Sequence, residues 1–423
     1  MKYALTLALS VIVVSFFLIF VLNPSFNILG FSVYELLWVL LIPIVVDAPQ
    51  TFAKGLILLY GRNTKPTSTC QLKPLPQISV IIPAHNEGEY IQNTLESVLE
   101  DPYPNKEVIV VDDGSTDATY VKAMMYADNQ RVRVIRREKA SGTKARAVNY
   151  GFVFTKGEII IVIDGDTLVE RGAIQKIIEP LHTSDDAIAV AGNVRVVNKV
   201  NLLTRLQAYE YLCSMELGRR WQSLFSGILV IPGAFGAFRR EVFESLGRMH
   251  PDTITEDFDL TVMLQKVRKR LVFAPEAVAW THAPEDWRGW IRQRVRWAVG
   301  QIQVYRKHLN ILFRRRFGLF GLFIVPNSIF MDVVALLLRF GWGIYIIASY
   351  TIDVLLKLSL VIFAFYLFLE FFTILFAAAL TPRREDVKYA ILAPIMVIFY
   401  RPLYSIVRLW AYLKAFLGRR VRW

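Results

Sequence analysis

The fold of this chain is set by one stretch, Ile78-Ser79-Val80-Ile81-Ile82-Pro83-Ala84-His85-Asn86-Glu87, an apolar run that ends in polar residues. Similar β-rich runs follow it, and amphipathic stretches with helical periodicity lie between them. The predicted strands are residues 78–82, 107–111, 131–135 and 158–163, and the predicted helices are residues 88–99, 117–127 and 144–154. This alternation predicts an α/β fold with a mostly parallel, doubly wound sheet and helices on both faces.

Polar motifs follow three of the predicted strands. The first strand ends in Pro83-Ala84-His85-Asn86-Glu87, the second in Asp112-Asp113-Gly114-Ser115 and the fourth in Asp164-Gly165-Asp166. In such sheets ligands bind beyond the carboxyl ends of the strands, where the loops converge. The sequence therefore predicts one ligand site at this edge.

The second half of the same block is less regular. We expect a strand at residues 187–194, an amphipathic helix at 202–217, a glycine loop at 232–238 and a basic, tryptophan-bearing helix or helix pair at 287–307. The last element suits a membrane interface, and a soluble surface helix is its alternative.

Apolar segments flank the block on both sides, and 54% of the chain is hydrophobic, too much for an ordinary soluble protein. Residues 3–22 carry no charge and can cross a hydrocarbon core of about 30 Å. A cleavable signal peptide is the alternative, but the run is long and a second apolar stretch follows at 31–59. Residues 317–380 and 389–412 form further tracts, and we expect their isolated charges to face other helices, a wet cavity or the interface.

The net charge of +13 is concentrated between the apolar blocks. Lys and Arg accumulate on the cytoplasmic side, so residues from about 61 to 316 are expected in the cytosol. Clustered basic residues also bind nucleic acid, but beside membrane spans attraction to anionic lipid is the simpler account, and no nucleic-acid partner is expected. A cytosolic basic tail would require an even number of C-terminal crossings. Cys70 and Cys213 lack metal-type spacing and are expected to be reduced thiols.

The turn Asp164-Gly165-Asp166 places two carboxylates side by side. Such hard oxygens gather around Mg²⁺ or Mn²⁺ and nucleotide phosphates, and the ion would stabilise a leaving diphosphate. Asp-Gly-Asp is also common turn chemistry, but the preceding apolar strand and the other acidic loops favour a metal site. Lys144 and Arg146, at the start of a predicted helix, would meet phosphate or remain solvated.

The loop after the second strand has a structural explanation of its own. Ser115 or Asp117 is expected to cap the following helix, and Gly114 permits a tight turn. Asp113, at the tip, is left to accept a hydrogen bond from a base or a ribose.

Two further motifs are linked by their spacing. Ile254-Thr255-Glu256-Asp257 precedes a helical pattern at 258–264, so helix capping by Thr255 or Asp257 is one account and general-base catalysis is the other. Gln293-x-x-Arg296-Trp297 begins 36 residues after Asp257. It places Gln and Arg on one helical face beside an indole that can stack on a sugar, and Arg296 can hold a diphosphate. By itself this pattern indicates only an amphipathic helix.

In this order, over about residues 78–308, the motifs resemble those of the membrane-embedded, inverting family-two glycosyltransferases, which include hyaluronan, cellulose, chitin and poly-N-acetylglucosamine synthases. The resemblance implies a GT-A fold, a UDP-sugar donor and a divalent cation, Mg²⁺ or Mn²⁺. It implies that Asp113 contacts the uracil with Asp112 supporting the loop, that Asp164 meets the nucleotide and that Asp166 meets the metal.

The resemblance also implies that Asp257 is the base, with Glu256 beside it. Gln293, Arg296 and Trp297 would close a donor–acceptor pocket below a channel. We add Pro83, Glu87 and Lys144 to the nucleotide-binding residues, Asp164 to the metal site and Asn193 to the pocket.

Within the group, Ala191-Gly192-Asn193, the segment 232–240 and Ile254-Thr255-Glu256-Asp257 look most like bacterial poly-N-acetylglucosamine synthases and their hyaluronan-synthase relatives. The Phe-x-Val-Thr-x-Lys loop of cellulose synthases and the Trp-Gly-Thr segment of hyaluronan synthases are missing. We therefore expect a processive synthase that adds N-acetylglucosamine or a related hexose and passes the polymer outward. The alternatives are single transfer to a polyprenyl phosphate or ceramide-like lipid, and a non-catalytic scaffold or transporter.

The expected organisation is a multi-pass plasma-membrane protein with a cytoplasmic catalytic domain, and it leaves accessory subunits open. Its segments are two transmembrane helices (1–60), a linker (61–76), the catalytic domain (77–281), interfacial helices (282–316), two to four C-terminal transmembrane helices (317–412) and a basic cytosolic tail (413–423).

Overall fold

The computed structural model describes residues 27–62, 75–245 and 248–417. The chain divides into two compact units. Of the described residues, the helical unit comprises 27–62, Leu212–Trp221 and Ser328–Leu409, and the sheet unit comprises 75–211, 222–245, 248–327 and 410–417. The predicted helix at 3–22, most of the linker, Cys70 and the end of the basic tail lie outside the described residues.

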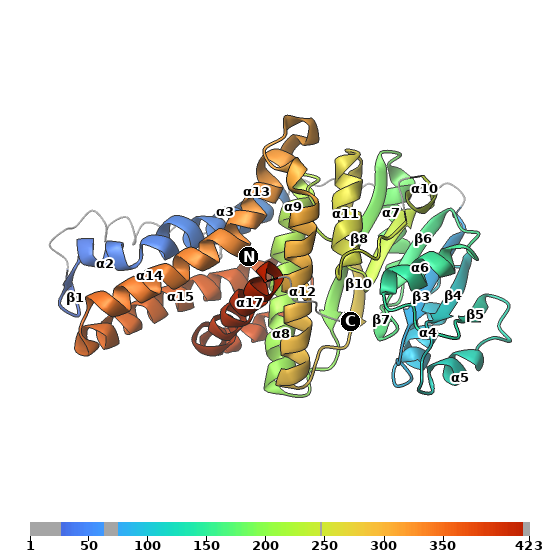
Figure 1. The fold of residues 1–423 in the computed structure, drawn as a ribbon, viewed down its shortest axis with the longest axis horizontal. Helices are drawn as coiled ribbons and strands as arrows, with labels where there is room; N and C mark the ends of the chain where they lie inside the picture. Colours follow the sequence, from blue (N-terminus) through green and yellow to red (C-terminus); the bar gives the residue numbers. More distant parts are fainter. Residues whose placement is uncertain (1–26, 63–74, 246–247, 418–423) are drawn as a thin grey trace. The chain divides into compact units, whose positions relative to one another are not determined.

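The sheet unit is built on an eight-stranded sheet with the order β5-β4-β3-β6-β9-β8-β10-β7 (Figure 1). Its strands are β3 (Ile78–Ala84), β4 (Lys106–Asp112), β5 (Val132–Arg136), β6 (Ile159–Ile163), β7 (Thr167–Val169), β8 (Ala187–Val196), β9 (Phe235–Arg239) and β10 (Arg270–Thr281). The four strands predicted first, β3 to β6, all form within one or two residues of their expected bounds.

The sheet is parallel in its first half and mixed in its second. β3 pairs in parallel with β4 and β6, and β4 with β5, as predicted. β9 then runs antiparallel between β6 and β8, and β7 runs antiparallel to β10. The prediction of a glycine loop at 232–238 is wrong from Phe235 onward, because the small residues Gly236 and Ala237 form the centre of β9.

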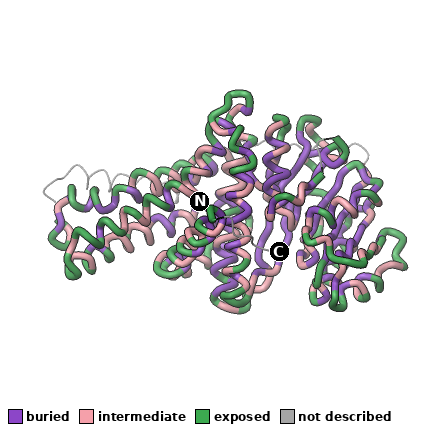
Figure 2. Tube along the Cα trace, in the orientation of Figure 1, coloured by how far each residue is buried: buried purple, intermediate pink, exposed green. Residues whose placement is uncertain are grey.

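The central strands are buried along their whole length, as the purple strands in Figure 2 show. Every residue of β3, β6 and β8 is buried, which explains why these runs are mostly apolar or small, with Asn193 and Arg195 as the polar exceptions in β8. The α-helices between β3 and residue 307 are α4 (Ile91–Glu100), α5 (Thr119–Met124), α6 (Lys144–Phe152), α7 (Ala173–Thr183), α8 (Leu202–Cys213), α9 (Arg220–Leu224), α10 (Glu241–Glu244), α11 (Glu256–Lys266) and α12 (Trp287–Lys307). Helix α12 has the predicted bounds, whereas α7, β7 and β10 were not predicted.

The described part of the chain contains three helices long and apolar enough to cross a membrane, by length and composition. They are Phe320–Ser349, Ile352–Leu380 and Arg384–Phe416. A bent pair, Val33–Val39 and Pro43–Gly61, passes the same test together, with a bend of 69° between its halves. This pair covers the second predicted N-terminal helix.

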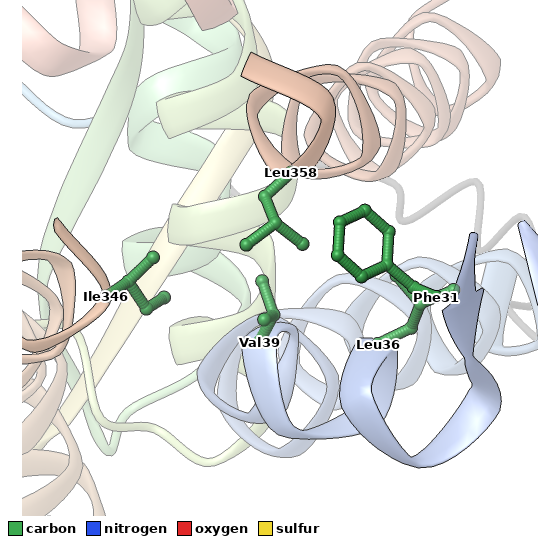
Figure 3. Close-up of a cluster of buried hydrophobic side chains, with 5 residues drawn as sticks. All are labelled: Phe31, Leu36, Val39, Ile346 and Leu358. Carbon is green, nitrogen blue, oxygen red and sulfur yellow. The ribbon is translucent and has the colours of Figure 1, made fainter. Parts of the chain in front are cut away.

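The helical unit has a small apolar core of its own (Figure 3). Phe31 from the β1–β2 hairpin (Asn27–Ile28 and Phe31–Ser32) and two residues of α2 (Val33–Val39), Leu36 and Val39, pack with Ile346 and Leu358. The last two come from α14 (Ala335–Ser349) and α15 (Ile352–Leu380). Helix α3 (Ala48–Arg62) packs along α15, where Phe52 contacts a row of phenylalanines.

Charged side chains of the apolar tracts meet partners on other helices. Arg401, in α17 (Arg401–Phe416), binds Glu370 with two hydrogen bonds of 2.8 and 2.7 Å. Arg408 lies 2.9 Å from the carboxylate of Asp332. Arg339 pairs with Asp47, which also accepts a hydrogen bond of 3.0 Å from Tyr366. The expectation that these charges face other helices is confirmed for these residues.

Candidate functional site

The acidic turn after β6 carries Asp164 and Asp166. Asp166 Oδ1 accepts hydrogen bonds from Thr167 Oγ1 at 3.2 Å and from Thr281 Oγ1 at 3.3 Å. Thr281 ends β10, so the turn is held by a strand that is distant in the sequence. Burial and the neighbouring charge of Asp164 raise the pKa of Asp166 to about 6.

Glu87 lies against the same turn. A Cβ atom at Gly165 would be 2.9 Å from Glu87 Cγ, so only glycine leaves room for this side chain. Burial, followed by the charges of Asp166, Asp164 and Asp117, raises the pKa of Glu87 to about 8. The edge of the sheet therefore concentrates negative charge that the protein itself neutralises only in part.

This excess of negative charge fits a divalent cation. Within the described ranges, no three His, Cys, Asp or Glu residues come together as a metal-binding set. The acidic turn itself offers the carboxylates of Asp164 and Asp166. Mg²⁺ is commonly bound through one or two carboxylates and the phosphates of a substrate, which is what this pair can support.

Lys144 connects the acidic turn to a second loop. It opens α6 and forms an ion pair with Asp164, with 11% of its side chain exposed. Burial alone would lower the pKa of Lys144, but the charges of Asp164, Glu256 and Asp257 outweigh it and raise the pKa. The alternative of a solvated lysine is therefore wrong. Arg146 is exposed and donates to the Ser141 carbonyl oxygen at 2.9 Å.

Gly233 brings Lys144 and Asp257 together. A Cβ atom at Gly233 would be 2.6 Å from Lys144 Nζ and 3.7 Å from Asp257 Oδ2. The Gly233 amide also donates to Asp257 Oδ2 at 3.3 Å. Asp164 and Asp257, 93 residues apart by their numbers, thus flank one lysine.

Glu256 and Asp257 form the first turn of α11. Asp257 Oδ1 accepts from the Phe258 amide at 2.8 Å, whereas the Thr255 side chain makes no capping hydrogen bond, so capping by Thr255 is not what this motif does. Burial and the charge of Asp257 raise the pKa of Glu256 to about 7, although Lys144 opposes the shift. The N-terminus of a helix favours negative charge at both positions.

The two acidic side chains at the end of β4, Asp112 and Asp113, each have a basic partner. Asp113 accepts from the Ser141 amide at 3.0 Å and from Ser141 Oγ at 2.6 Å, and Arg137 Nε lies 3.2 Å from its Oδ1. Buried Asp112 pairs with Arg136 at 3.3 Å. Asp113 was expected to be free for a base or ribose, but here it ties down the segment that leads to α6.

The structure confirms the expected tight turn at Gly114 in this loop but not the expected helix cap at Ser115. Gly114 has φ +69°, which confirms the tight turn, and a Cβ atom there would be 2.4 Å from the Ala140 amide nitrogen. Ser115 does not cap the next helix, since its hydroxyl accepts from the Asn86 amide at 2.9 Å. Asp117 accepts from the Thr119 amide at 3.0 Å, at the start of α5.

Helix α12 is capped by Asp286, which accepts from the Gly289 amide at 2.8 Å. Its predicted site residues are Gln293, Arg296 and Trp297, and the Gln293 side-chain oxygen is buried with no hydrogen-bond partner. The indole of Trp297 lies 4.3 Å from the guanidinium carbon of Arg294.

Asn193 and Pro83 are placed by the sheet. The Asn193 side-chain amide donates to the Pro275 carbonyl oxygen at 2.8 Å and holds a bulge in β10 where the pairing with β8 shifts between Ala274 and Val278. Pro83 is buried in β3.

Sequence reasoning missed several residues of this region. Arg294, in the middle of the predicted motif, is fully buried and pairs with Glu210 at 2.8 Å. Its position next to Gln293 was the available signal. Gly233 could have been suspected from its Pro-Gly pair, whereas Ser141 and Thr281 carry no signal, because only tertiary pairing brings them to the acidic loops.

The sequence of this chain is similar to those of known glycosyltransferases. The family description "Glycosyl transferase family 2" matches residues 79–247. The "Probable glycosyltransferase YdaM" of Bacillus subtilis is 33% identical over 73% of this chain and 75% of that protein. The "Poly-beta-1,6-N-acetyl-D-glucosamine synthase" of Staphylococcus aureus is 30% identical over 67% of this chain and 68% of that protein.

The corresponding synthase of Staphylococcus epidermidis is 34% identical, but the match spans only 55% of its length. Among solved structures, the mannosyltransferase PcManGT from Pyrobaculum calidifontis superposes with a TM-score of 0.61 at 20% identity, over 90% of this chain and all of that one. This likeness shows the fold. The expected GT-A architecture is thereby confirmed, and the chain belongs to glycosyl transferase family 2.

Proposed function

We propose that this protein is an inverting, metal-dependent glycosyltransferase that polymerises a UDP-sugar, UDP-N-acetylglucosamine or a related hexose donor, into a polysaccharide at the membrane. The observation that carries the proposal is the position of Lys144. It pairs with Asp164 on the nucleotide side and lies beside Gly233 and Asp257 on the acceptor side. Groups suited to the donor phosphates and a candidate base therefore meet at one point.

In this proposal Asp257 acts as the general base. Its carboxylate accepts the proton of an acceptor hydroxyl while the hydroxyl oxygen attacks the anomeric carbon from the face opposite to the diphosphate. The new glycosidic bond forms as the bond from carbon to phosphate oxygen breaks, and UDP leaves with its electron pair. The amides of Gly233 and Phe258 hold the two carboxylate oxygens in place for this step.

Asp164, Asp166 and Lys144 act on the leaving group. The two carboxylates would hold Mg²⁺ or Mn²⁺, which when bound supplies positive charge to the departing diphosphate. Lys144 is free to exchange its pairing with Asp164 for a phosphate oxygen, since both are anionic. Glu87, crowded against the same turn, adds to the negative charge that makes a cation favourable.

The nucleoside is assigned to the loops after β3 and β4. Asp113 keeps Ser141 and Arg137 in position, with Asp112 bound to Arg136 behind it. We propose that the base is bound by this tethered loop, so that removing Asp113 weakens UDP binding through the loop as well as through any direct contact.

The acceptor is assigned to the start of α11 and to α12. Trp297 offers an aromatic face for a sugar ring, and Gln293 and Arg296 lie one helical turn apart on the same helix. A growing polysaccharide is favoured over a single lipid acceptor, because the Staphylococcus aureus relative, which aligns with this chain over 68% of its own length, is named as a polysaccharide synthase. We further propose that the product leaves through the membrane-spanning part.

For the membrane arrangement we propose two full crossings after the sheet unit. The C-terminal apolar tract begins at Phe320 and ends at Phe416, and both residues belong to the sheet unit. Near its end, Tyr412 donates to Gln301 of α12 at 3.0 Å, and Arg306 of α12 donates to the Ala415 carbonyl oxygen at 3.1 Å. A tract that starts and ends on the same side of the membrane must cross it an even number of times. We therefore propose that Arg384–Phe416 lies along the membrane interface and that the catalytic domain is in the cytosol.

One assay tests the proposal directly. The full chain in detergent or liposomes is incubated with UDP-N-acetylglucosamine, UDP-glucose, UDP-glucuronate or UDP-galactose and with Mg²⁺ or Mn²⁺, and UDP release and product length are measured. We expect metal-dependent UDP release with one donor and products of many sugars. Products of one sugar on a lipid would overturn polymerisation, and no UDP release with any donor would overturn the whole proposal.

A further inference from the structure

A buried carboxylate lies two residues after the proposed base. Asp259, in the first turns of α11, is fully buried. Its Oδ2 lies 2.7 Å from Lys307 Nζ and its Oδ1 lies 2.6 Å from His308 Nε2. Both partners stand at the C-terminal end of α12, so one side chain of the helix that carries Glu256 and Asp257 is fastened to the helix that carries Trp297.

The ring of His308 is held from its other side as well. Lys266, at the end of α11, places its Nζ 2.7 Å from His308 Nδ1. An ammonium group can only donate, so Nδ1 accepts and the ring proton is on Nε2, which donates to Asp259. Burial by itself raises the pKa of Asp259, but the hydrogen bonds from His308 and Lys307 outweigh burial and hold its pKa below the usual range.

Three further contacts fasten the start of α11 and the two residues before it to α12. A Cβ atom at Gly300 would be 2.5 Å from Thr255 Cγ2, so the Thr255 side chain packs directly against the α12 backbone at this glycine. The Ile254 amide donates to Gln303 Oε1 at 3.1 Å, and the rings of Phe258 and Tyr305 meet edge to face at 5.7 Å.

A buried ion pair is a poor device for stability alone, because apolar side chains of similar volume stabilise a core equally well or better. What a buried, fully hydrogen-bonded carboxylate provides is a defined geometry. Asp259 lies half a helical turn from Asp257 in α11. Its partners Lys307 and His308 lie about three turns beyond Trp297 at the end of α12.

We propose that Asp259 is a positioning residue for the transfer reaction, which clamps the first turn of α11 onto α12 through Lys307 and His308 so that the base and the acceptor helix keep one spacing. The inference rests on the proposed function, since it takes Asp257 as the base. It predicts a residue that contacts no substrate but controls the rate of the chemical step.

The test is Asp259→Asn in the full chain. The asparagine oxygen still accepts from His308, but its NH₂ group now faces the ammonium of Lys307, donor against donor. With kcat normalised to the number of UDP-binding sites, we expect a loss of about 10- to 100-fold, because small misplacements of reacting groups cost that much. KM for the UDP-sugar and the affinity for UDP should stay within about twofold of wild type.

A second substitution distinguishes positioning from simple weakening of the fold. In Asp259→Asn/Lys307→Gln the new glutamine oxygen can accept from the asparagine NH₂ group, which restores the hydrogen bond without charge. We expect this double variant to recover most of the normalised kcat. Asp252→Asn is the matched control, since Asp252 contacts the same lysine at 3.4 Å but is 63% exposed, and it should behave as wild type.

Normalised kcat of Asp259→Asn within twofold of wild type would overturn the inference, as would a double variant no better than the single one. If Asp259→Asn does not fold, Lys307→Met takes its place, because Lys307 is 31% exposed and its loss leaves Asp259 bonded to His308. Lys307→Met should lower normalised kcat about threefold to tenfold, and an unchanged value would overturn the inference. A wild-type protein that releases no UDP from any donor would contradict the proposed function itself. That failure is seen in the wild type alone, whereas failure of the present inference is seen only when variants are compared with an active wild type.

Discussion

The charged residues of the sheet unit and those of the helical unit follow opposite rules. In the helical unit, three acid–base pairs join different helices: Glu370 with Arg401, Asp332 with Arg408 and Asp47 with Arg339. At the edge of the sheet, Glu87, Asp164 and Asp166 crowd together with one lysine among them, and two of the three carboxyl groups have raised pKa values.

The difference separates charges that hold a structure from charges that await a ligand. A charge in an apolar tract costs several kcal/mol, so it is neutralised by a partner on another helix. At a ligand site, excess charge of one sign stays because the ligand supplies the other sign. Substitutions that remove a carboxylate should therefore have opposite effects on stability in the two units.

The largest effect is expected for Asp257→Asn. Loss of a general base lowers kcat by about 10² to 10⁴-fold, while the affinity for UDP stays within about twofold, since Asp257 lies on the acceptor side of Lys144. Stopped assays of UDP release and a UDP titration measure the two quantities. Full UDP release by this variant would rule out Asp257 as the general base and, with it, the assigned role of the first turn of α11.

Asp166→Asn comes next and tests the metal site. We expect the Mn²⁺ concentration for half-maximal activity to rise by about 100-fold or more, because losing a ligand exceeds the 10- to 100-fold cost of losing a ligand's supporting residue. In the absence of metal and nucleotide, the same substitution should raise Tm at pH 8, since the ionised carboxylate is buried and lies beside the charge of Asp164. A lower Tm under those conditions would contradict the contrast between the two units.

Glu256→Gln is expected to show its effect through pH. The pKa of Glu256 is raised from 4.5 to about 7 in the folded protein, so its contribution to stability is fully present below pH 4.5 and is lost as the pH rises through about 7. At pH 8 the glutamine variant should therefore have a higher free energy of unfolding than wild type, by on the order of 1–3 kcal/mol, and a higher unfolding temperature. At pH 5 the difference between the two proteins should be smaller. Thermal unfolding at the two pH values measures it, and an equal margin at both would contradict the assigned shift.

The smallest effect is expected in the helical unit. Glu370→Gln leaves Arg401 without its carboxylate and should lower the free energy of unfolding by about 1–2 kcal/mol, a reduced value because 45% of the arginine side chain is exposed. Thermal unfolding in one detergent measures the loss, and Arg401→Gln should match it. A rise in stability, as expected for Asp166→Asn, would show that the helical pairs also await a ligand.

Local patterns in the sequence were sufficient for the elements whose apolar residues repeat with a clear period. Strands β3 to β6, helix α6 and helix α12 lie where the periodicity of single segments predicts them. β9 was missed because Gly236 and Ala237 look like a loop, and their strand character comes only from pairing with β6 and β8. β7 is three residues long, too short for any period to show.

The candidate site divides in the same way. The carboxylates after β4 and β6 and before α11 were predictable, because their residue types and their places next to strands and helices are local properties. Their partners were decided by tertiary structure alone: Asp113 is bound by Ser141, Asp164 by Lys144 and Asp259 by His308. Charge and periodicity are properties of single residues and short segments, so the sequence shows them directly. Hydrogen-bond partners depend on which distant segments the sheet order brings within about 3 Å.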